Sequence, residues 1–147
     1  MDKFDTKILE VLQRNARVTL AALAEEVGLS KSPCQARIKR LEEEGVILGY
    51  EARLNLAKLG AGHIAFVQVT LNSTHDEALG EFNKAALAIR EVEQCHMIAS
   101  SFDYLLKVRT KDISSYRRVL GEKLSRLPHV SHTSTFVCME AVKDVGM

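Results

Sequence analysis

Residues 30–42 read SKSPCQARIKRLE, and this stretch carries most of the information about the fold. In a helix over residues 30–44, Cys34, Ile38 and Leu41 fall within one narrow arc, so we expect them to face a core. Basic residues occur between positions 31 and 40 without a single acid, and three glutamates follow at positions 42–44. Such a helix attracts phosphate along its start and middle and repels it at its end.

Two shorter helical patterns precede this helix. Asp5 is placed to cap a helix whose apolar stripe includes Ile8, and Thr19 is placed to cap the next one. Gly28 suits the left-handed turn residue that would end the second helix. Three short helices joined by tight turns predict a helix-turn-helix domain over residues 1–50.

The third helix is therefore a candidate DNA reader. The Gln35 amide suits a bidentate contact with adenine, and Lys39 can donate to guanine or phosphate. The run 32–35 also fits a capping box with proline at the first helical position, which is a competing use of Gln35. A solvated basic face on an ordinary helix is the alternative interpretation. The candidate DNA-binding residues are Lys31, Ser32, Gln35, Ala36, Arg37, Lys39 and Arg40.

The pattern changes after this domain. Tyr50, Ala52 and Leu54 alternate with charged residues, so the segment from 46 to 56 is β-like, and residues 51–61 are predicted as a connecting strand or linker. Beyond it, strand-like and helical stretches follow in the order strand-helix-strand, strand-helix-strand. That order predicts a ferredoxin-like βαββαβ domain over residues 62–147. The expected strands are residues 64–71, 92–99, 104–110 and 130–139.

The predicted fold class is thus α+β, with an N-terminal winged helix-turn-helix domain and a C-terminal ferredoxin-like domain. In the second domain, Thr74 to Glu77 reads as a capping box, and the last helix is expected to end before Pro128. Both helices should pack on one sheet face. Ile64 and Phe66 then leave apolar surface on the other face, and burying it against a second copy would make an oligomer.

Composition narrows the possible functions. Apolar residues make up 46% of the 147 residues and charged residues 27%, with a formal net charge of +1, which excludes a cationic coat over the whole chain. The longest apolar run, residues 85–89, is far shorter than a membrane span needs. The start of the chain lacks the pattern of a secretory signal, and the three cysteines are distant and odd in number. We therefore expect a cytoplasmic protein without a membrane partner.

Neither a metal site nor an enzyme is expected. The cysteines and histidines form no close cluster of the structural-zinc type in the sequence. The run Gly60-Ala61-Gly62 precedes a strand, so it is not a dinucleotide-binding fingerprint, and neither a nucleophile elbow nor a Walker sequence is present. The cysteines and histidines that could serve as metal ligands are Cys95, His96, His129, His132 and Cys138.

Four segments together resemble one family. They are Ser30 to Glu42, Asp2-x-x-Asp5-x-x-Ile8-Leu9, Phe102 to Lys107, and Leu127-Pro128-x-Val130. They are similar, in the same order, to motifs of the Lrp/AsnC family of bacterial and archaeal transcription regulators. The resemblance implies a C-terminal domain that dimerises and senses amino acids. It also implies dimers that assemble into octamers or similar rings able to wrap or bend DNA.

The resemblance further implies an effector site between dimers, at the loop that joins the second and third strands. Backbone N–H groups of residues 99–103 would hold the α-carboxylate, and Asp103 would pair with the α-ammonium. Asp103 has an alternative role as a turn residue. Many members have glycine followed by a polar or acidic residue where this chain has Ser100 and Ser101, and glycine allows closer backbone approach. The candidate effector-binding residues are Met97, Ala99, Ser100, Ser101, Asp103, Ile113, Phe136 and Cys138.

These observations predict a sequence-specific regulator that binds double-stranded DNA and uses no cofactor, with a free amino acid as effector. Leucine is the family-level default, and proline is a weaker candidate. Control of amino-acid metabolism follows from the same resemblance. Two alternatives remain: an architectural DNA-binding protein of the same fold that ignores ligands, and an amino-acid-binding regulatory subunit of an enzyme. Footprinting with and without each amino acid separates the three.

Overall fold

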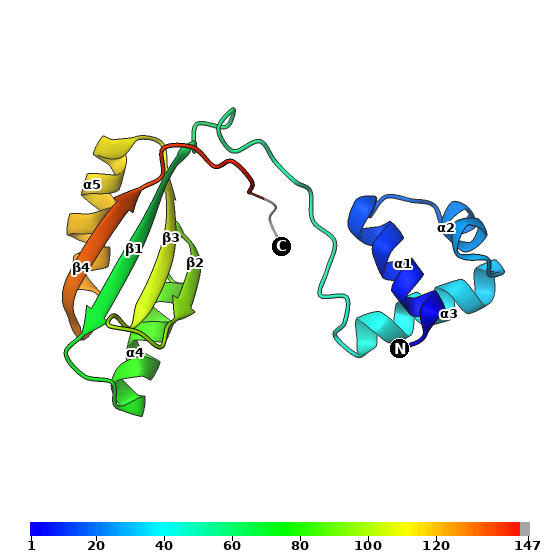
Figure 1. Ribbon diagram of the computed structural model, residues 1–147, viewed down its shortest axis with the longest axis horizontal. Helices are drawn as coiled ribbons and strands as arrows, with labels where there is room; N and C mark the ends of the chain where they lie inside the picture. Colours follow the sequence, from blue (N-terminus) through cyan, green and yellow to red (C-terminus); the bar gives the residue numbers. More distant parts are fainter. Residues whose placement is uncertain (145–147) are drawn as a thin grey trace. The chain divides into compact units, whose positions relative to one another are not determined.

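The computed structural model describes residues 1–144 and divides the chain into two compact units (Figure 1). The first unit is Met1–Arg53 and the second begins at Leu54. Each unit has its own hydrophobic core. The predicted second domain runs to residue 147, and its last three residues lie outside the described part of the chain.

The first unit consists of α1 (Lys3–Arg14), α2 (Leu20–Val27) and α3 (Lys31–Glu43). One hydrophobic cluster joins the three helices. It includes Ile8 of α1, Leu23 of α2 and Leu41 of α3, all of them fully buried. As predicted, the Thr19 side chain caps α2, and Gly28 ends it with a φ of +82°. The helix-turn-helix arrangement is therefore confirmed.

Two of the expected caps are wrong. The residue that caps α1 is Asp2, whose carboxylate accepts from the N–H groups of Phe4 and Asp5, so the helix begins before the predicted cap Asp5. The helix α4 (Asp76–Leu87) begins after His75, which makes no side-chain capping bond, so Thr74 is not its cap. The acids in the first turn of α4 suit the helix dipole instead.

The second unit is a four-stranded sheet with two helices, in the strand order β2-β3-β1-β4. Every neighbouring pair is antiparallel, and both helices cover the same sheet face (Figure 1). This is the predicted ferredoxin-like arrangement. Besides α4, its elements are β1 (His63–Leu71), β2 (Val92–Met97), β3 (Tyr104–Thr110), α5 (Ile113–Glu122), the short 3-10 helix η1 (Leu124–Arg126) and β4 (Val130–Val137).

The predicted β-like segment 46–56 does not form a strand. An extended segment becomes a strand only where a neighbouring backbone completes its hydrogen bonds, and no other described residue of the chain pairs with this one. Its alternating apolar residues are therefore exposed, as in Leu48 and Leu54. The place of a wing after α3 is occupied by extended chain.

The two faces of the sheet differ sharply. Val67, Leu106 and Phe82 pack between the sheet and its helices and are fully buried. On the opposite face, Phe66 of β1 lies beside Phe136 of β4. Phe136 is 53% exposed. The expected apolar surface on the face without helices is therefore present.

Replacing Phe82 with alanine tests the packing of α4 on the sheet. Phe82 is completely buried, so Phe82→Ala should lower the free energy of unfolding by about 3–5 kcal/mol. Leu87, on the same helix, is 86% exposed, and Leu87→Ala should change it by less than about 0.5 kcal/mol. Chemical denaturation followed by circular dichroism measures both. Equal losses in the two variants would contradict this packing.

Candidate DNA-binding and ligand-binding surfaces

The exposed face of α3 carries most of the predicted DNA-reading residues. Lys31, Ser32, Gln35 and Ala36 are all exposed. The Lys39 side chain is 75% exposed, and its ammonium lies 3.6 Å from the carboxylate of Glu43, one turn further on the same helix. Exposed pairs of this kind bind weakly, so Lys39 stays available to an external anion.

The start of α3 settles the competing use of Gln35. The capping position is Ser30, which makes no side-chain capping bond, so the predicted capping box at residues 32–35 is wrong. Pro33 occupies the third position of the helix, where a backbone N–H has no helical partner and its loss costs little. The Gln35 amide is not used as a cap, and it lies on the exposed side of the helix.

Arg37 and Arg40 lie differently from the other predicted residues. Nη1 of Arg37 donates to the carboxylates of both Asp2 and Asp5, each at 2.8 Å. Nη2 of Arg40 donates to Asp5 at 2.7 Å. The Asp5 side chain is only 1% exposed, although it carries a charge. We call these four residues the α1–α3 clamp, because they join the start of α1 to the middle of α3.

Hydrogen bonds explain the electrostatics of this clamp. The Asp5 carboxylate accepts from the Asp2 backbone N–H at 2.9 Å, and this bond, followed by Arg37 and Arg40, lowers its pKa from 3.8 to about 2. The pKa of Asp2 is lowered chiefly by the Asp5 N–H, and the pKa of Arg37 is raised by Asp5 and Asp2. Asp2, Asp5 and Arg37 are therefore charged at neutral pH.

Sequence reasoning placed Asp5 at a cap and both arginines on the DNA-binding face. A signal for the clamp was nevertheless present in the spacing. Asp2 and Asp5 are three residues apart, as are Arg37 and Arg40, so each pair lies on one face of its helix.

The predicted effector loop is closed by Asp103. Its N–H donates to the Val69 carbonyl at 2.9 Å, and its carbonyl accepts from Ile98 at 2.8 Å. Its carboxylate accepts from the Leu71 N–H at 2.7 Å. The side chain therefore fastens the loop to the end of β1, which is the turn role weighed above. Ser100 and Ser101 are exposed beside it.

One chain does not bring the whole predicted effector set together. Met97, Ala99, Ser100, Ser101 and Asp103 lie at the end of the sheet where β3 begins. Ile113 follows the other end of β3, about 20 Å away at the usual rise per residue. The backbone N–H of Cys138 donates to the carbonyl of Ile64, near the start of β1, and Phe136 lies opposite Phe66 on the neighbouring strand. A site containing all of them requires residues from more than one chain.

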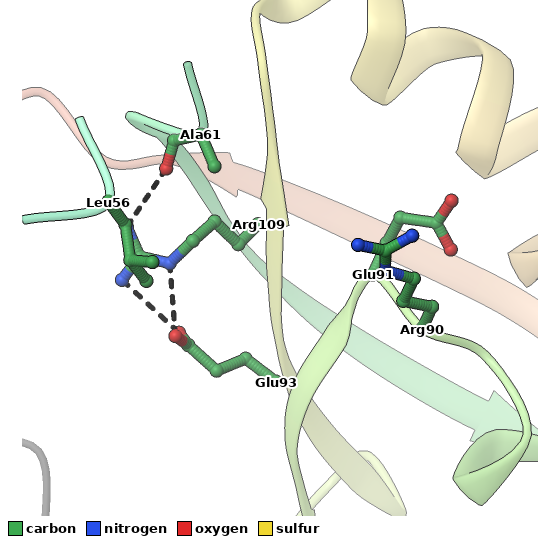
Figure 2. Close-up of a pocket in the computed structure, with 6 residues that line it drawn as sticks. All are labelled: Leu56, Ala61, Arg90, Glu91, Glu93 and Arg109. Atoms are coloured by element: carbon green, nitrogen blue, oxygen red, sulfur yellow. Dashed lines mark hydrogen bonds and ion pairs between the residues drawn. The ribbon is translucent and has the colours of Figure 1, made fainter. Parts of the chain in front are cut away.

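Two hollows of the second unit are lined by residues outside the predicted loop. One of about 430 Å³ is shown in Figure 2, where Arg109 donates to the Ala61 carbonyl at 3.2 Å and to Glu93 at 3.0 Å. Arg109 and Glu93, two of the charged residues that line this hollow, are thus paired with each other. Another of about 300 Å³ contains Cys138 alone from the effector set.

Residues 1–144 contain no cluster of three or more histidine, cysteine or acidic residues arranged to hold a metal ion. No helix in the same range is long and apolar enough to cross a membrane.

Comparison with family models divides the chain into two matched regions. Residues 1–47 match the model described as winged helix-turn-helix DNA-binding. Residues 64–147 match the model described as the Lrp/AsnC ligand binding domain. Each match falls within one of the two units described above.

Similar proteins include regulators from several bacteria. The chain is 60% identical over 147 residues to a proline dehydrogenase transcriptional activator of Rhizobium radiobacter, covering 100% of this chain and 94% of that protein. It is 46% identical over 146 residues to the leucine-responsive regulatory protein of Haemophilus influenzae, covering 99% and 88%.

Similar solved structures extend over both units. An AsnC family transcriptional regulator from Agrobacterium tumefaciens matches with a TM-score of 0.94 and 32% identity, covering 100% of this chain and 95% of that one. A transcriptional regulator from Neisseria meningitidis, solved in complex with L-Met, matches with a TM-score of 0.91 and 31% identity, covering 98% and 93%.

Acid titration of stability tests the buried carboxylate. The pKa of Asp5 is lower in the folded chain, so its contribution to stability is complete above pH 3.8 and is lost as the pH falls towards about 2. Asp5→Asn should be less stable than wild type at neutral pH and should lose less stability across that interval. Urea denaturation at a series of pH values measures this. Parallel curves for the two proteins would contradict the assigned pKa.

Proposed function

The chain belongs to the Lrp/AsnC family of DNA-binding transcriptional regulators, and from this premise we propose that α3 reads a particular duplex sequence while an amino acid controls the assembly. The family consists of regulators rather than enzymes, and the chain carries both a DNA-binding and a ligand-binding domain. The observation that carries the DNA-binding proposal is the exposed face of α3, with a free amide and unburied ammonium groups side by side.

Each residue on this face has a role suited to its chemistry. Lys31 and Lys39 contact phosphate or guanine, and Gln35 reads adenine through both atoms of its amide. Ser32 and Ala36 are small enough to let the helix lie close to the bases, and the serine hydroxyl can also donate. Arg40 is bonded to Asp5 through Nη2, and its side chain is still 45% exposed, so its other N–H donors can contact the phosphate backbone.

Two copies of α3 in a dimer would contact half-sites about one helical turn apart, or a multiple of it. The apolar sheet face around Phe66 and Phe136 supports such a dimer, because it is the surface that a second copy would cover. We propose that dimers assemble further into an octamer or a similar ring. The separation of Ile113 and Cys138 from the effector loop supports this proposal, because a neighbouring copy can supply what one chain holds apart.

An amino acid is the effector that the ligand-binding domain supports. We propose proline as the first candidate, because the relative from Rhizobium radiobacter is named for activating proline dehydrogenase, and leucine as the second. By the same comparison, this chain would control the breakdown of an amino acid. It would act in the cytoplasm, where a regulator meets DNA, and no further cofactor is proposed.

The effector favours one assembly or one spacing of the α3 pairs only if it binds the two states with different affinity. We propose that the Ser100–Asp103 loop binds the effector at a junction between copies. The backbone N–H groups of Ser100 and Ser101 would hold the carboxylate of the amino acid, since the Asp103 N–H is already bonded to Val69. Asp103 would offer one oxygen to the ammonium while the other accepts from Leu71.

Replacing Gln35 tests base reading. Gln35→Ala should lose about 1–3 kcal/mol of discrimination at the adenine it contacts, because the bidentate amide is removed. Binding of the purified protein to a random-sequence duplex pool, followed by sequencing, measures the preference at each position. Lys39→Ala serves as control and should weaken binding at every sequence. An unchanged sequence preference in Gln35→Ala would contradict base reading by this residue.

Replacing Asp103 separates its two roles. Asparagine keeps an acceptor for the Leu71 N–H but removes the negative charge, so Asp103→Asn should unfold at nearly the wild-type temperature and bind the amino acid at least about tenfold more weakly. Asp103→Ala removes both and should also lose thermal stability. Calorimetry with proline, leucine and methionine measures the affinity. Wild-type affinity in Asp103→Asn would contradict an ammonium contact, and no heat from any amino acid with wild type would contradict the effector proposal.

A further inference from the structure

We infer that Arg37 is a positioning residue, which holds α3 in its DNA-reading orientation through Asp2 and Asp5, and that it is not a ligand of DNA phosphate. The inference rests on the proposed function, since it concerns how the proposed reading helix is held. It separates the basic residues of α3 into two groups. Lys31 and Lys39 face outward, whereas the α1–α3 clamp uses the charge of Arg37 within the domain.

The Arg37 guanidinium is hydrogen-bonded to groups of the same domain. A single nitrogen donates to two carboxylates from the first turn of α1 and the residue before it, both at 2.8 Å. The guanidinium also lies 5.5 Å from the centre of the Phe4 ring, which adds a cation–π contact from the same helix. The Arg37 side chain is 25% exposed, against 75% for Lys39.

The burial of the Asp5 carboxylate makes it costly for Arg37 to leave. Asp5 is buried, and a buried carboxylate without its cations is costly. One Asp5 oxygen accepts from Arg37, and the other accepts from Arg40 and from the Asp2 N–H. Moving Arg37 towards a phosphate would leave one oxygen of this buried group without its partner.

The clamp has a direct consequence for α3. The amide of Gln35 and the ammonium of Lys39 flank Arg37 in the sequence, two residues away on either side. Bonding Arg37 to the start of α1 therefore fixes the rotation and height of the α3 segment that carries Gln35 and Lys39. Losing the clamp would let α3 shift, and base contacts depend on alignment more than phosphate contacts do.

Salt dependence distinguishes a positioning arginine from a phosphate ligand. Each cation that neutralises a phosphate releases counterions, which adds about 0.9 to the slope of log affinity against log salt. An arginine that is already neutralised by aspartates releases none. The matched pair of variants is Arg37→Gln and Lys39→Gln, because both replace one cation of the same helix with the same side chain.

The experiment measures fluorescence anisotropy of the full-length protein on two duplexes at several salt concentrations. One duplex is enriched from a random pool by the wild-type protein, and the other has mixed sequence. Arg37→Gln should bind the enriched duplex about tenfold more weakly, the scale of one lost charged hydrogen bond, with an unchanged slope and unchanged binding to mixed sequence. Lys39→Gln should lower the slope by about 0.9 for each α3 bound, on both duplexes.

Two further variants keep the test decisive. Asp5→Asn combined with Arg37→Gln should weaken specific binding no more than the worse single variant, because both disrupt one interaction. Asp2→Asn keeps a good capping residue and the buried carboxylate, so it should fold even if Arg37→Gln does not. It should weaken specific binding less than Arg37→Gln, again without changing the slope.

Each result has a distinct meaning. A slope that falls in Arg37→Gln as much as in Lys39→Gln, or additive losses in the double variant, would overturn the positioning role and leave the proposed function intact. Failure of the wild-type protein to prefer any enriched duplex over mixed sequence would overturn the proposed function, and the positioning role with it.

Discussion

The burial of Asp5 is the constraint on which the DNA-binding unit depends. A carboxylate that is 1% exposed needs cations and N–H donors around it, and the chain supplies them from α3 and from the residue that caps α1. The ion pairs therefore do more than add stability. They link the start of the chain to the middle of the reading helix, so that the cap of one helix sets the position of another. The apolar cluster below, with Ile8 and Leu41 fully buried, fills the same junction.

This arrangement changes the meaning of the charge pattern. The sequence shows four basic residues in α3 before the glutamates, which suggests one uniform binding face. In the folded unit, Arg37 forms ion pairs with Asp2 and Asp5, and Arg40 forms an ion pair with Asp5. The attraction to phosphate then comes mainly from Lys31 and Lys39. A helix with so few free cations is suited to binding that depends on base contacts and on several copies acting together.

Elements were predictable where local signals agreed. The left-handed Gly28, the Thr19 cap and the strand-helix order of the second unit all follow from nearest neighbours along the chain. The cap at Asp5 was wrong because Asp2, three residues earlier, offers an equally good acceptor. The cap at Thr74 was wrong because α4 begins after His75 and has no side-chain cap. Periodicity places each pair of the clamp on one face of its helix, but it does not show that the two pairs meet, since they lie more than thirty positions apart. The segment 46–56 has a strand pattern but no described residue pairs with it. The predicted effector residues lie at opposite ends of the sheet, and local sequence signals do not show which ends of the strands meet.

We therefore propose that α3 reads the bases, that the α1–α3 clamp aligns it, and that the Ser100–Asp103 loop, completed by another copy, controls the assembly. The central claim is that DNA and an amino acid act on the same assembly. The most direct test is the affinity of the wild-type protein for a duplex enriched from a random pool, measured with and without saturating proline or leucine. The account predicts a preference for that duplex over mixed sequence and a change in its affinity with at least one of the two amino acids. Sequence preference with no response to either, nor to any other amino acid, would contradict it.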